Sequence, residues 1–315
     1  MKNFRFYTLL YIDTEREAGS VNGIKGDFEK QIRTYIRCCE VLAKSLAFFT
    51  SCELTVLTNQ KDYIERNSVG LSVVEIPFSL IIPRDVEFYS AHYKIDVIDY
   101  FKSRDDKGEY AILIDNDVLC LNPIPQNLWN CIENKIPVYY NVTNRRYPAY
   151  GRERLIRDKE ILMPGESSLG IWAGGEFIGG DRSFYEQLSD EIKLRQEAYF
   201  EKYKSFHHQG DEVLVSVAIE VLLRKGVYVC DVSSFDGISR YWSQPTLHVQ
   251  NHWKAFTSNF LIHLPADKVY ISKIDDIDEK LDIRIGRYLV VKRFDSWVRY
   301  EVRKTIEWIK AKCLS

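Results

Sequence analysis

Short apolar runs alternate with longer stretches of helical periodicity along most of the chain. The run at residues 110–114 has no polar alternation, which is typical of a strand buried on both faces of a sheet. Further apolar runs predict strands at residues 4–12, 53–58, 71–77, 136–142, 169–180 and 227–232.

The segments between these runs carry apolar residues at three- and four-residue spacing. Residues 28–49 show this pattern over the greatest length. The spacing also predicts helices at residues 62–67, 87–101, 128–132, 183–203 and 207–226. Strands that alternate with helices in this way predict an α/β fold with a mostly parallel sheet and right-handed crossovers.

Two segments depart from the alternation. Residues 144–165 hold five arginines and little apolar periodicity, so we expect a mobile loop or an insertion over the active face. Residues 284–315 hold nine Lys or Arg against three acids, and apolar residues recur there at helical spacing beside Trp297 and Trp308. A basic amphipathic helix of this kind is typical of a helix on an anionic membrane surface, but also of a terminal helix docked on the core.

The amino-acid composition excludes few classes of protein. Apolar residues make up 45% and charged residues 28% of the chain, as in ordinary globular proteins, and a net charge of -2 excludes no class of partner. The seven cysteines include no CxxC pair, which predicts buried or partly buried thiols in a reducing compartment. The chain shows no signal peptide and no membrane-spanning run, so we expect a cytoplasmic protein.

Candidate chemistry begins where the strand at residues 110–114 ends. Asp115 and Asp117 are unlikely core residues, because burial of unpaired charge is costly. Ligands bind at the carboxyl edge of open α/β sheets, and hard carboxylate oxygens suit Mg²⁺ or Mn²⁺. A strand followed by a plain acidic turn is the alternative.

Two later features also attract attention. Gly174 and Gly175 interrupt a predicted strand, which often marks the close approach of a ligand or another backbone. Asp211 and Glu212 begin a predicted helix, where the helix dipole favours anions. Acidic residues at helix starts are also common caps, so a catalytic and a capping role both remain open.

Together, the DxD motif after the fourth strand, the paired glycines, the acidic helix start and a late histidine resemble the GT-A fold of nucleotide-sugar glycosyltransferases. The nearest families are two retaining ones. The first contains glycogenin and the bacterial lipopolysaccharide galactosyl- and glucosyltransferases, and the second contains the ABO blood-group transferases. The resemblance covers most of residues 4–268.

The resemblance implies a metal site and a phosphate contact. Asp115, Asp117 and His263 would hold a divalent cation, Mn²⁺ or Mg²⁺, at the diphosphate of the donor. The glycogenin-like pattern His-x-Gly-x-x-Lys gives Lys268 a phosphate contact, although Pro265 stands where that family has Gly.

It also implies roles in binding the donor. Lys94 would approach the diphosphate, and Tyr11 and Asp13 would lie at the base. The remaining members of the predicted donor-binding set are Asn116, Gly174 and Gly175.

The acidic helix start has a counterpart in the ABO-like family, where a Glu lies beneath the anomeric carbon of the donor sugar. This implies that Glu212 is the candidate nucleophile and that Asp211 binds sugar hydroxyls, although Gln209 and Gly210 interrupt the match. In an inverting enzyme, the same acid would be the general base.

We therefore expect a metal-dependent glycosyltransferase that moves a hexose from a nucleotide-sugar, UDP-linked in our interpretation, to a glycan or glycolipid. Residues 1–268 would form the catalytic domain, with a nucleotide-binding half at 1–143, the loop at 144–165 and an acceptor half at 166–268. Residues 269–315 would form a helical extension that contacts the inner face of a membrane, as in lipopolysaccharide or capsule synthesis.

The alternatives to a glycosyltransferase are a haloacid-dehalogenase-type phosphatase and a non-catalytic glycan-binding module. No nucleic-acid partner is expected.

Overall fold

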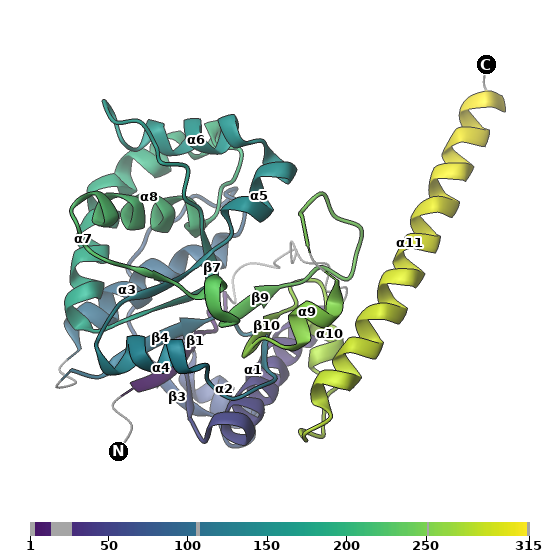
Figure 1. The fold of residues 1–315 in the computed structure, drawn as a ribbon, viewed down its shortest axis with the longest axis horizontal. Helices are drawn as coiled ribbons and strands as arrows, with labels where there is room; N and C mark the ends of the chain where they lie inside the picture. Colours follow the sequence, from purple (N-terminus) through teal and green to yellow (C-terminus); the bar gives the residue numbers. More distant parts are fainter. Residues whose placement is uncertain (1–3, 14–26, 105–107, 251, 314–315) are drawn as a thin grey trace.

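A seven-stranded sheet with helices on both faces forms the body of the molecule (Figure 1). The structure is a computed structural model that describes residues 4–13, 27–104, 108–250 and 252–313, with the backbone alone at 146–148 and 307–313. The predicted loop at residues 14–26 lies outside these ranges.

The strand order of this sheet is β3-β2-β1-β4-β7-β6-β8. Four strands run parallel: β1 (Phe4–Leu9), β2 (Leu54–Thr58), β3 (Ser72–Glu75) and β4 (Tyr110–Ile114). β7 (Ala173–Gly180) is antiparallel to β4 and to β6 (Val138–Asn141), and β8 (Cys230–Asp231) is parallel to β6. The predicted α/β fold with a mostly parallel sheet is confirmed.

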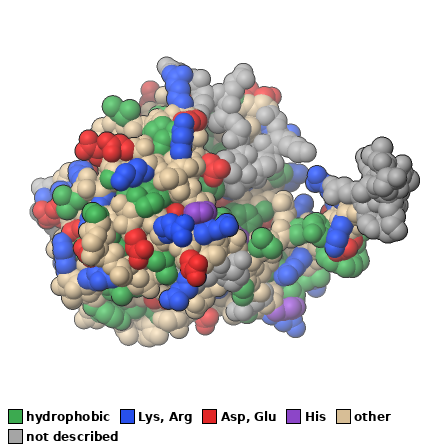
Figure 2. Space-filling view, turned by 90° about the horizontal axis from the view of Figure 1, so that it is seen from above, with side chains coloured by type: hydrophobic (Ala, Val, Ile, Leu, Met, Phe, Trp, Pro, Cys, Tyr) green, Lys and Arg blue, Asp and Glu red, His purple; other side chains and the backbone are tan. Residues whose placement is uncertain are grey.

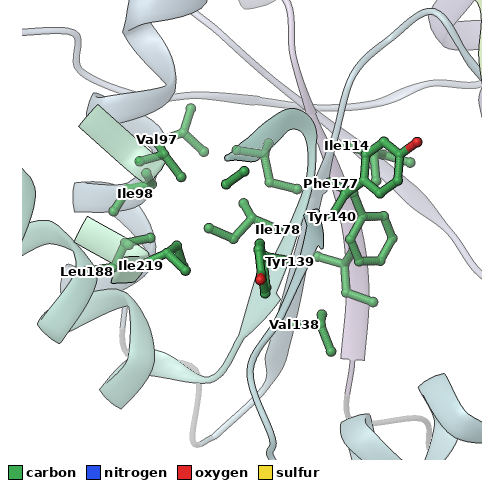
Figure 3. Close-up of a cluster of buried hydrophobic side chains, with 14 of the residues drawn as sticks. Val97, Ile98, Ile114, Val138, Tyr139, Tyr140, Phe177, Ile178, Leu188 and Ile219 are labelled. Atoms are coloured by element: carbon green, nitrogen blue, oxygen red, sulfur yellow. The ribbon is translucent and has the colours of Figure 1, made fainter. Parts of the chain in front are cut away.

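Apolar side chains join the sheet to its two helical layers. α1 (Phe28–Thr50) and α2 (Lys61–Asn67) pack on one face, and α3 (Lys94–Ser103), α7 (Arg182–Lys202) and α8 (Asp211–Arg224) pack on the other. Figure 3 shows side chains of the second layer beside Ile178 of β7, whereas Phe177 points the opposite way. Alternate residues of β7 thus serve both layers.

A second, three-stranded sheet lies beside the carboxyl edge of the first. It consists of β5 (Val118–Cys120), β10 (Leu261–His263) and β9 (Ile238–Arg240), in that order. β5 follows β4 after a turn of three residues, so the turn joins the two sheets. The remaining short helices are α4 (Gln126–Glu133), α9 (Trp253–Thr257), α10 (Lys268–Ile271), η2 (Tyr203–Ser205) and η3 (Val232–Phe235).

The prediction of a loop at residues 144–165 is wrong, because most of these residues are helical. Residues there form α5 (Thr143–Tyr150) and α6 (Arg152–Ile161), which meet at Gly151 with a φ of 84°. The buried side of α6 is largely polar, because Lys159 pairs with Glu220 and Asp158 accepts hydrogen bonds from His207. A helix anchored through ion pairs has no apolar stripe for a periodicity criterion to detect.

Two predicted helices begin later than expected. The helix predicted at 87–101 is a 3₁₀ turn, η1 (Tyr89–Tyr93), followed by α3, because Phe88 adopts the left-handed conformation with a φ of 54°. The helix predicted from residue 207 begins at Asp211, with Gly210 as its N-cap.

The first turns of the last helix, α11 (Leu281–Cys313), pack on the body, and the helix then extends away from it (Figure 1). Leu281, Ile285 and Leu289 are buried, whereas Phe294 is 65% exposed and Trp297 is 55% exposed. On the face seen in Figure 2, acidic and basic side chains are interspersed over the body. Among the described helices, none has the combination of length and apolar character that a bilayer crossing requires.

Six of the cysteines fall in the described side chains, and all six are free thiols. Cys38, Cys39, Cys52, Cys120 and Cys131 are buried, and Cys230 is half-buried. The prediction of buried or partly buried thiols is confirmed for these six.

Candidate active site

Strand pairing brings three potential metal ligands together at the junction of the two sheets. The chain leaves β4, turns through residues 115–117 and enters β5. β10 runs antiparallel to β5 with His263 opposite Val118, so the imidazole lies beside the acidic turn. A contact between residues about 150 positions apart thus follows from the register of two strands.

Asp115, Asp117 and His263 offer ligand atoms that all lie within 4.8 Å of one another. His263 Nε2 is 3.0 Å from Asp117 Oδ1 and 3.8 Å from Asp115 Oδ2. Lysines hold the other two carboxylate oxygens: Lys94 Nζ is 2.7 Å from Asp115 Oδ1, and Lys268 Nζ donates to Asp117 Oδ2. Each carboxylate therefore turns one oxygen to a lysine and the other to His263. Two such oxygens and an imidazole nitrogen fit the divalent cation that the resemblance implies.

The electrostatics of this cluster are set by burial and by its opposite charges. Burial alone would raise the pKa of Asp117, but His263 and Lys268 outweigh it and hold the pKa well below its usual value. Burial lowers the pKa of His263, but Asp117 and Glu176 outweigh it and raise the pKa to about 9. The imidazole is therefore protonated between two carboxylates, at a position where a bound cation would replace the proton.

Glu176 and Arg240 stand behind the metal ligands, and neither belongs to the predicted set of site residues. Glu176 Oε1 is 3.1 Å from His263 Nδ1, and Arg240 binds both oxygens of Glu176. Burial raises the pKa of Glu176, but Arg240 and His263 outweigh it and hold the pKa at about 2. A carboxylate on the second nitrogen fixes the orientation and tautomer of a metal-binding histidine. The signal that could have found Glu176 is a charged residue within the apolar, glycine-rich run at residues 169–180, whereas Arg240 lies in no such run.

The same arginine reaches the start of α8. Arg240 Nη2 donates to Glu212 Oε1 at 2.8 Å, and the Gly175 backbone N–H donates to the same oxygen at 3.2 Å. The other oxygen accepts a hydrogen bond from Trp172 Nε1 at 2.9 Å. The side chain of Glu212 is thus held in place by donors from β7, β9 and the segment before β7.

Asp211 has a different environment from its neighbour. It is buried, and its Oδ2 atom accepts no hydrogen bond from the described residues, although Lys94 Nζ is 3.6 Å away. Burial raises the pKa of Asp211 to about 6; Lys94 opposes the rise, and Glu212 and Asp115 add to it. A carboxyl group with a pKa near 6 can exchange a proton near neutral pH, so Asp211 is a candidate acid or base.

Gly174 and Gly175 each leave room for a different neighbouring side chain. A Cβ on Gly175 would lie 3.0 Å from Lys94 Nζ and 3.1 Å from Asp211 Oδ2, so this glycine leaves room for those two side chains. A Cβ on Gly174 would lie 2.3 Å from Glu176 Oε2. Gly174 therefore accommodates the buried glutamate.

The residues predicted at the end of the first strand lie on another side of the site. The ring of Tyr11 stacks on Tyr93 with centroids 3.8 Å apart and remains half-buried. Asn116 Nδ2 donates to the Leu9 carbonyl at 3.2 Å, which ties the acidic turn to the end of β1.

A cavity of about 630 Å³ connects these groups, a size typical of small-molecule sites. The predicted residues that line it are Tyr11, Asp13, Lys94, Asp115, Asn116, Asp117, Gly175, Asp211, Glu212, His263 and Lys268. Gly174 is the one predicted residue that does not. Pro265 also lines the cavity, and its carbonyl accepts a hydrogen bond from Lys268 at 3.1 Å.

No protein-family model matches the sequence, and no curated protein matches it either. Solved structures with a similar fold include mouse xyloside xylosyltransferase 1 in its apo form, at 10% identity and a TM-score of 0.47, over 82% of this chain and 97% of that one. Another is the galactosyltransferase LgtC in complex with donor and acceptor sugar analogues, at 11% identity and a TM-score of 0.48, over 88% of this chain and 98% of that one. Such a likeness concerns the fold alone. A function for this chain therefore has to be inferred from the residues that line the cavity.

We predict that Arg240→Met destabilises the protein by roughly 3–5 kcal/mol, because it leaves Glu176 buried without its main counter-charge. Urea unfolding measures this change. The matched control is Lys193→Met, which breaks a more exposed pair with Asp99 and should cost at most about 1 kcal/mol. Equal effects of the two substitutions would contradict the prediction.

Proposed function

We propose that this chain is a metal-dependent glycosyltransferase that moves a hexose from a nucleotide-sugar, UDP-linked in our assignment, to a hydroxyl of a glycan or glycolipid. One observation carries the proposal: Asp115, Asp117 and His263 converge on the wall of a large cavity, each aspartate with a lysine on its other oxygen. A phosphate-rich donor suits such a site, because the lysines and a cation can share its negative charge.

The divalent cation, Mn²⁺ or Mg²⁺, would be held by the two aspartates and the histidine and would neutralise charge on the diphosphate. Lys94 and Lys268 lie beside those ligands and would bind phosphate oxygens. At the end of β1, the half-buried ring of Tyr11 and the carboxylate of Asp13 line the cavity, and we assign them to the nucleoside. The paired lysines and the aromatic ring support a nucleotide over a simple phosphate ester.

We assign Asp211 to the reacting sugar and Glu212 to positioning. In the transfer, the bond from the anomeric carbon to the phosphate oxygen breaks, a bond to the acceptor oxygen forms, and the acceptor hydroxyl loses its proton. Asp211 is the acid with a pKa near neutrality, whereas Arg240, Gly175 and Trp172 occupy both oxygens of Glu212. The outcome at the anomeric carbon, retention or inversion, stays open in this proposal.

We further propose that α11 places the enzyme on an anionic membrane surface. Val290, Phe294, Trp297, Val298 and Val302 are exposed, and their spacing puts them on one side of the helix. Lys292, Arg299 and Arg303 fall on the opposite side. Exposed aromatic and apolar groups backed by cations favour the surface of an anionic bilayer, which agrees with a glycolipid acceptor.

Metal-dependent nucleotide binding gives the first test. We predict that UDP stabilises the protein only when Mn²⁺ is present, by roughly 2.7 kcal/mol at 100 times its Kd, and that Asp117→Asn abolishes this effect. Thermal denaturation with a panel of nucleoside diphosphates measures it.

The matched control is Asp190→Asn, which alters an exposed aspartate paired with Lys102. Equal stabilisation of the Asp117 variant would exclude the metal site. Hydrolysis of p-nitrophenyl phosphate without any nucleotide response would favour the phosphatase alternative.

The roles of the two acids give a second test. Asp211→Asn should lower kcat by about 10²–10⁴-fold with little loss of stability, because it removes a buried proton acceptor that has no hydrogen bond to lose at Oδ2. Glu212→Gln should lower stability, because one amide nitrogen would face a donor. Steady-state transfer and urea unfolding of both variants separate the two effects, and near-normal turnover by the Asp211 variant would refute the assignment.

The membrane proposal predicts that the protein floats with vesicles of phosphatidylcholine and phosphatidylglycerol but not with phosphatidylcholine alone. Replacement of Phe294 and Trp297 by serine should abolish flotation and leave UDP binding unchanged, because both side chains are exposed and neither lines the cavity. Unchanged flotation of that double variant would contradict the proposal.

A further inference from the structure

Five aromatic rings line the cavity on the side of α8 and have no part in the function proposed so far. They are Phe88, Tyr150, His208, Trp242 and His248, and we call them the aromatic wall. The centroid of His208 is 5.3 Å from Phe88 and 5.9 Å from Tyr150. His248 lies 5.6 Å from Tyr150 and stacks on Trp242 at 5.8 Å, so the rings form one continuous row.

The backbone around this row is held in place. The Trp242 backbone N–H donates to Gln250 Oε1 at 2.9 Å, and Gln250 Nε2 donates to the Trp242 carbonyl at 2.8 Å, which closes the loop between them. A Cβ on Gly210 would lie 2.7 Å from His208 Nε2, so the glycine makes room for this ring. The left-handed backbone of Phe88 sets the direction of the first ring in the row.

The row lies next to the groups that we assign to transfer. His208 Nε2 is 3.5 Å from Glu212 Oε2, and the His208 ring is 5.6 Å from Trp172, which holds the same carboxylate. The aromatic side chains at the end of β1 form a separate cluster from the aromatic wall, in which Tyr11 packs on Tyr93 and Phe78. An acceptor has to approach the acids of α8, so the wall borders the space that an acceptor would occupy.

We propose that the aromatic wall binds the acceptor and that the acceptor presents a pyranose ring there; this inference rests on the proposed glycosyltransferase function. One face of a pyranose is a patch of C–H bonds, which packs on aromatic rings, while its hydroxyls reach the rim. Trp242 lines the cavity and its side chain is half-buried, although its Nε1 atom is enclosed and has no hydrogen-bond partner among the described residues, so the ring rather than the N–H would contact a sugar. The acceptor is therefore a glycan, rather than a serine or threonine of a polypeptide.

Direct binding of simple glycosides tests this inference. Titrations of methyl β-D-galactoside, methyl β-D-glucoside and lactose by saturation-transfer NMR, in the presence of UDP and Mg²⁺, give their affinities for the wild-type chain. At least one should bind saturably, and Trp242→Ala should weaken it at least tenfold. Trp242→Phe keeps a ring and should weaken it less than threefold.

Two controls make the outcome decisive. Leu247→Ala lies in the same loop, is exposed in the wild type and does not line the cavity, so it should leave glycoside binding unchanged. The Kd of UDP should stay within twofold of wild type in every variant. Should Trp242→Ala not fold, Tyr150→Ala replaces it with the same expected tenfold loss. Absence of saturable glycoside binding to the wild type, or full glycoside affinity in the alanine variants, would refute the assignment of the aromatic wall to the acceptor. A failure of UDP to bind would instead refute the proposed glycosyltransferase function.

Discussion

Five buried charged groups have to satisfy one another simultaneously, and the architecture of the site depends on this constraint. Asp117, His263, Glu176, Arg240 and Glu212 form one continuous chain of ion pairs and hydrogen bonds. They come from the acidic turn, β10, β7, β9 and α8 respectively. An unpaired member would cost several kcal/mol in a low-dielectric interior, so the two sheets and α8 are kept in register within hydrogen-bond distances. The geometry of the cavity is thereby fixed before any ligand arrives.

This network also explains why two adjacent acids differ. Glu212 belongs to the chain and has donors on both oxygens, whereas Asp211 faces Lys94 across Gly175 and is otherwise desolvated. The different surroundings give the two neighbouring carboxyl groups different roles, because the hydrogen bonds fix the position of Glu212 while burial raises the pKa of Asp211. Because Lys94 also contacts Asp115, the same lysine links the acid of α8 to the metal ligands.

The sequence predicted the parts of this arrangement that leave a local or periodic signal. The apolar run at 110–114 predicts the buried strand, with the paired aspartates after it, and the resemblance to the glycogenin-like His-x-Gly-x-x-Lys pattern implies His263 and Lys268, which the structure places at Asp117. Arg240 was missed because its role depends on the pairing of β9 with β10, which no local pattern encodes. α6 was missed because its buried contacts are ionic, and the wall because its rings come from four separate segments.

The position of α11 bears on which acceptor can reach the wall. Arg293 donates to the Tyr241 hydroxyl at 3.1 Å, directly before Trp242, so the exposed helix and the loop of the wall are joined. That loop exposes Leu247 and Val249 to solvent by 76% and 52%. A soluble glycan would gain nothing from such a surface. Under the two proposals, for α11 and for the wall, a lipid-linked acceptor would place its sugar at Trp242 while its lipid remained in the membrane.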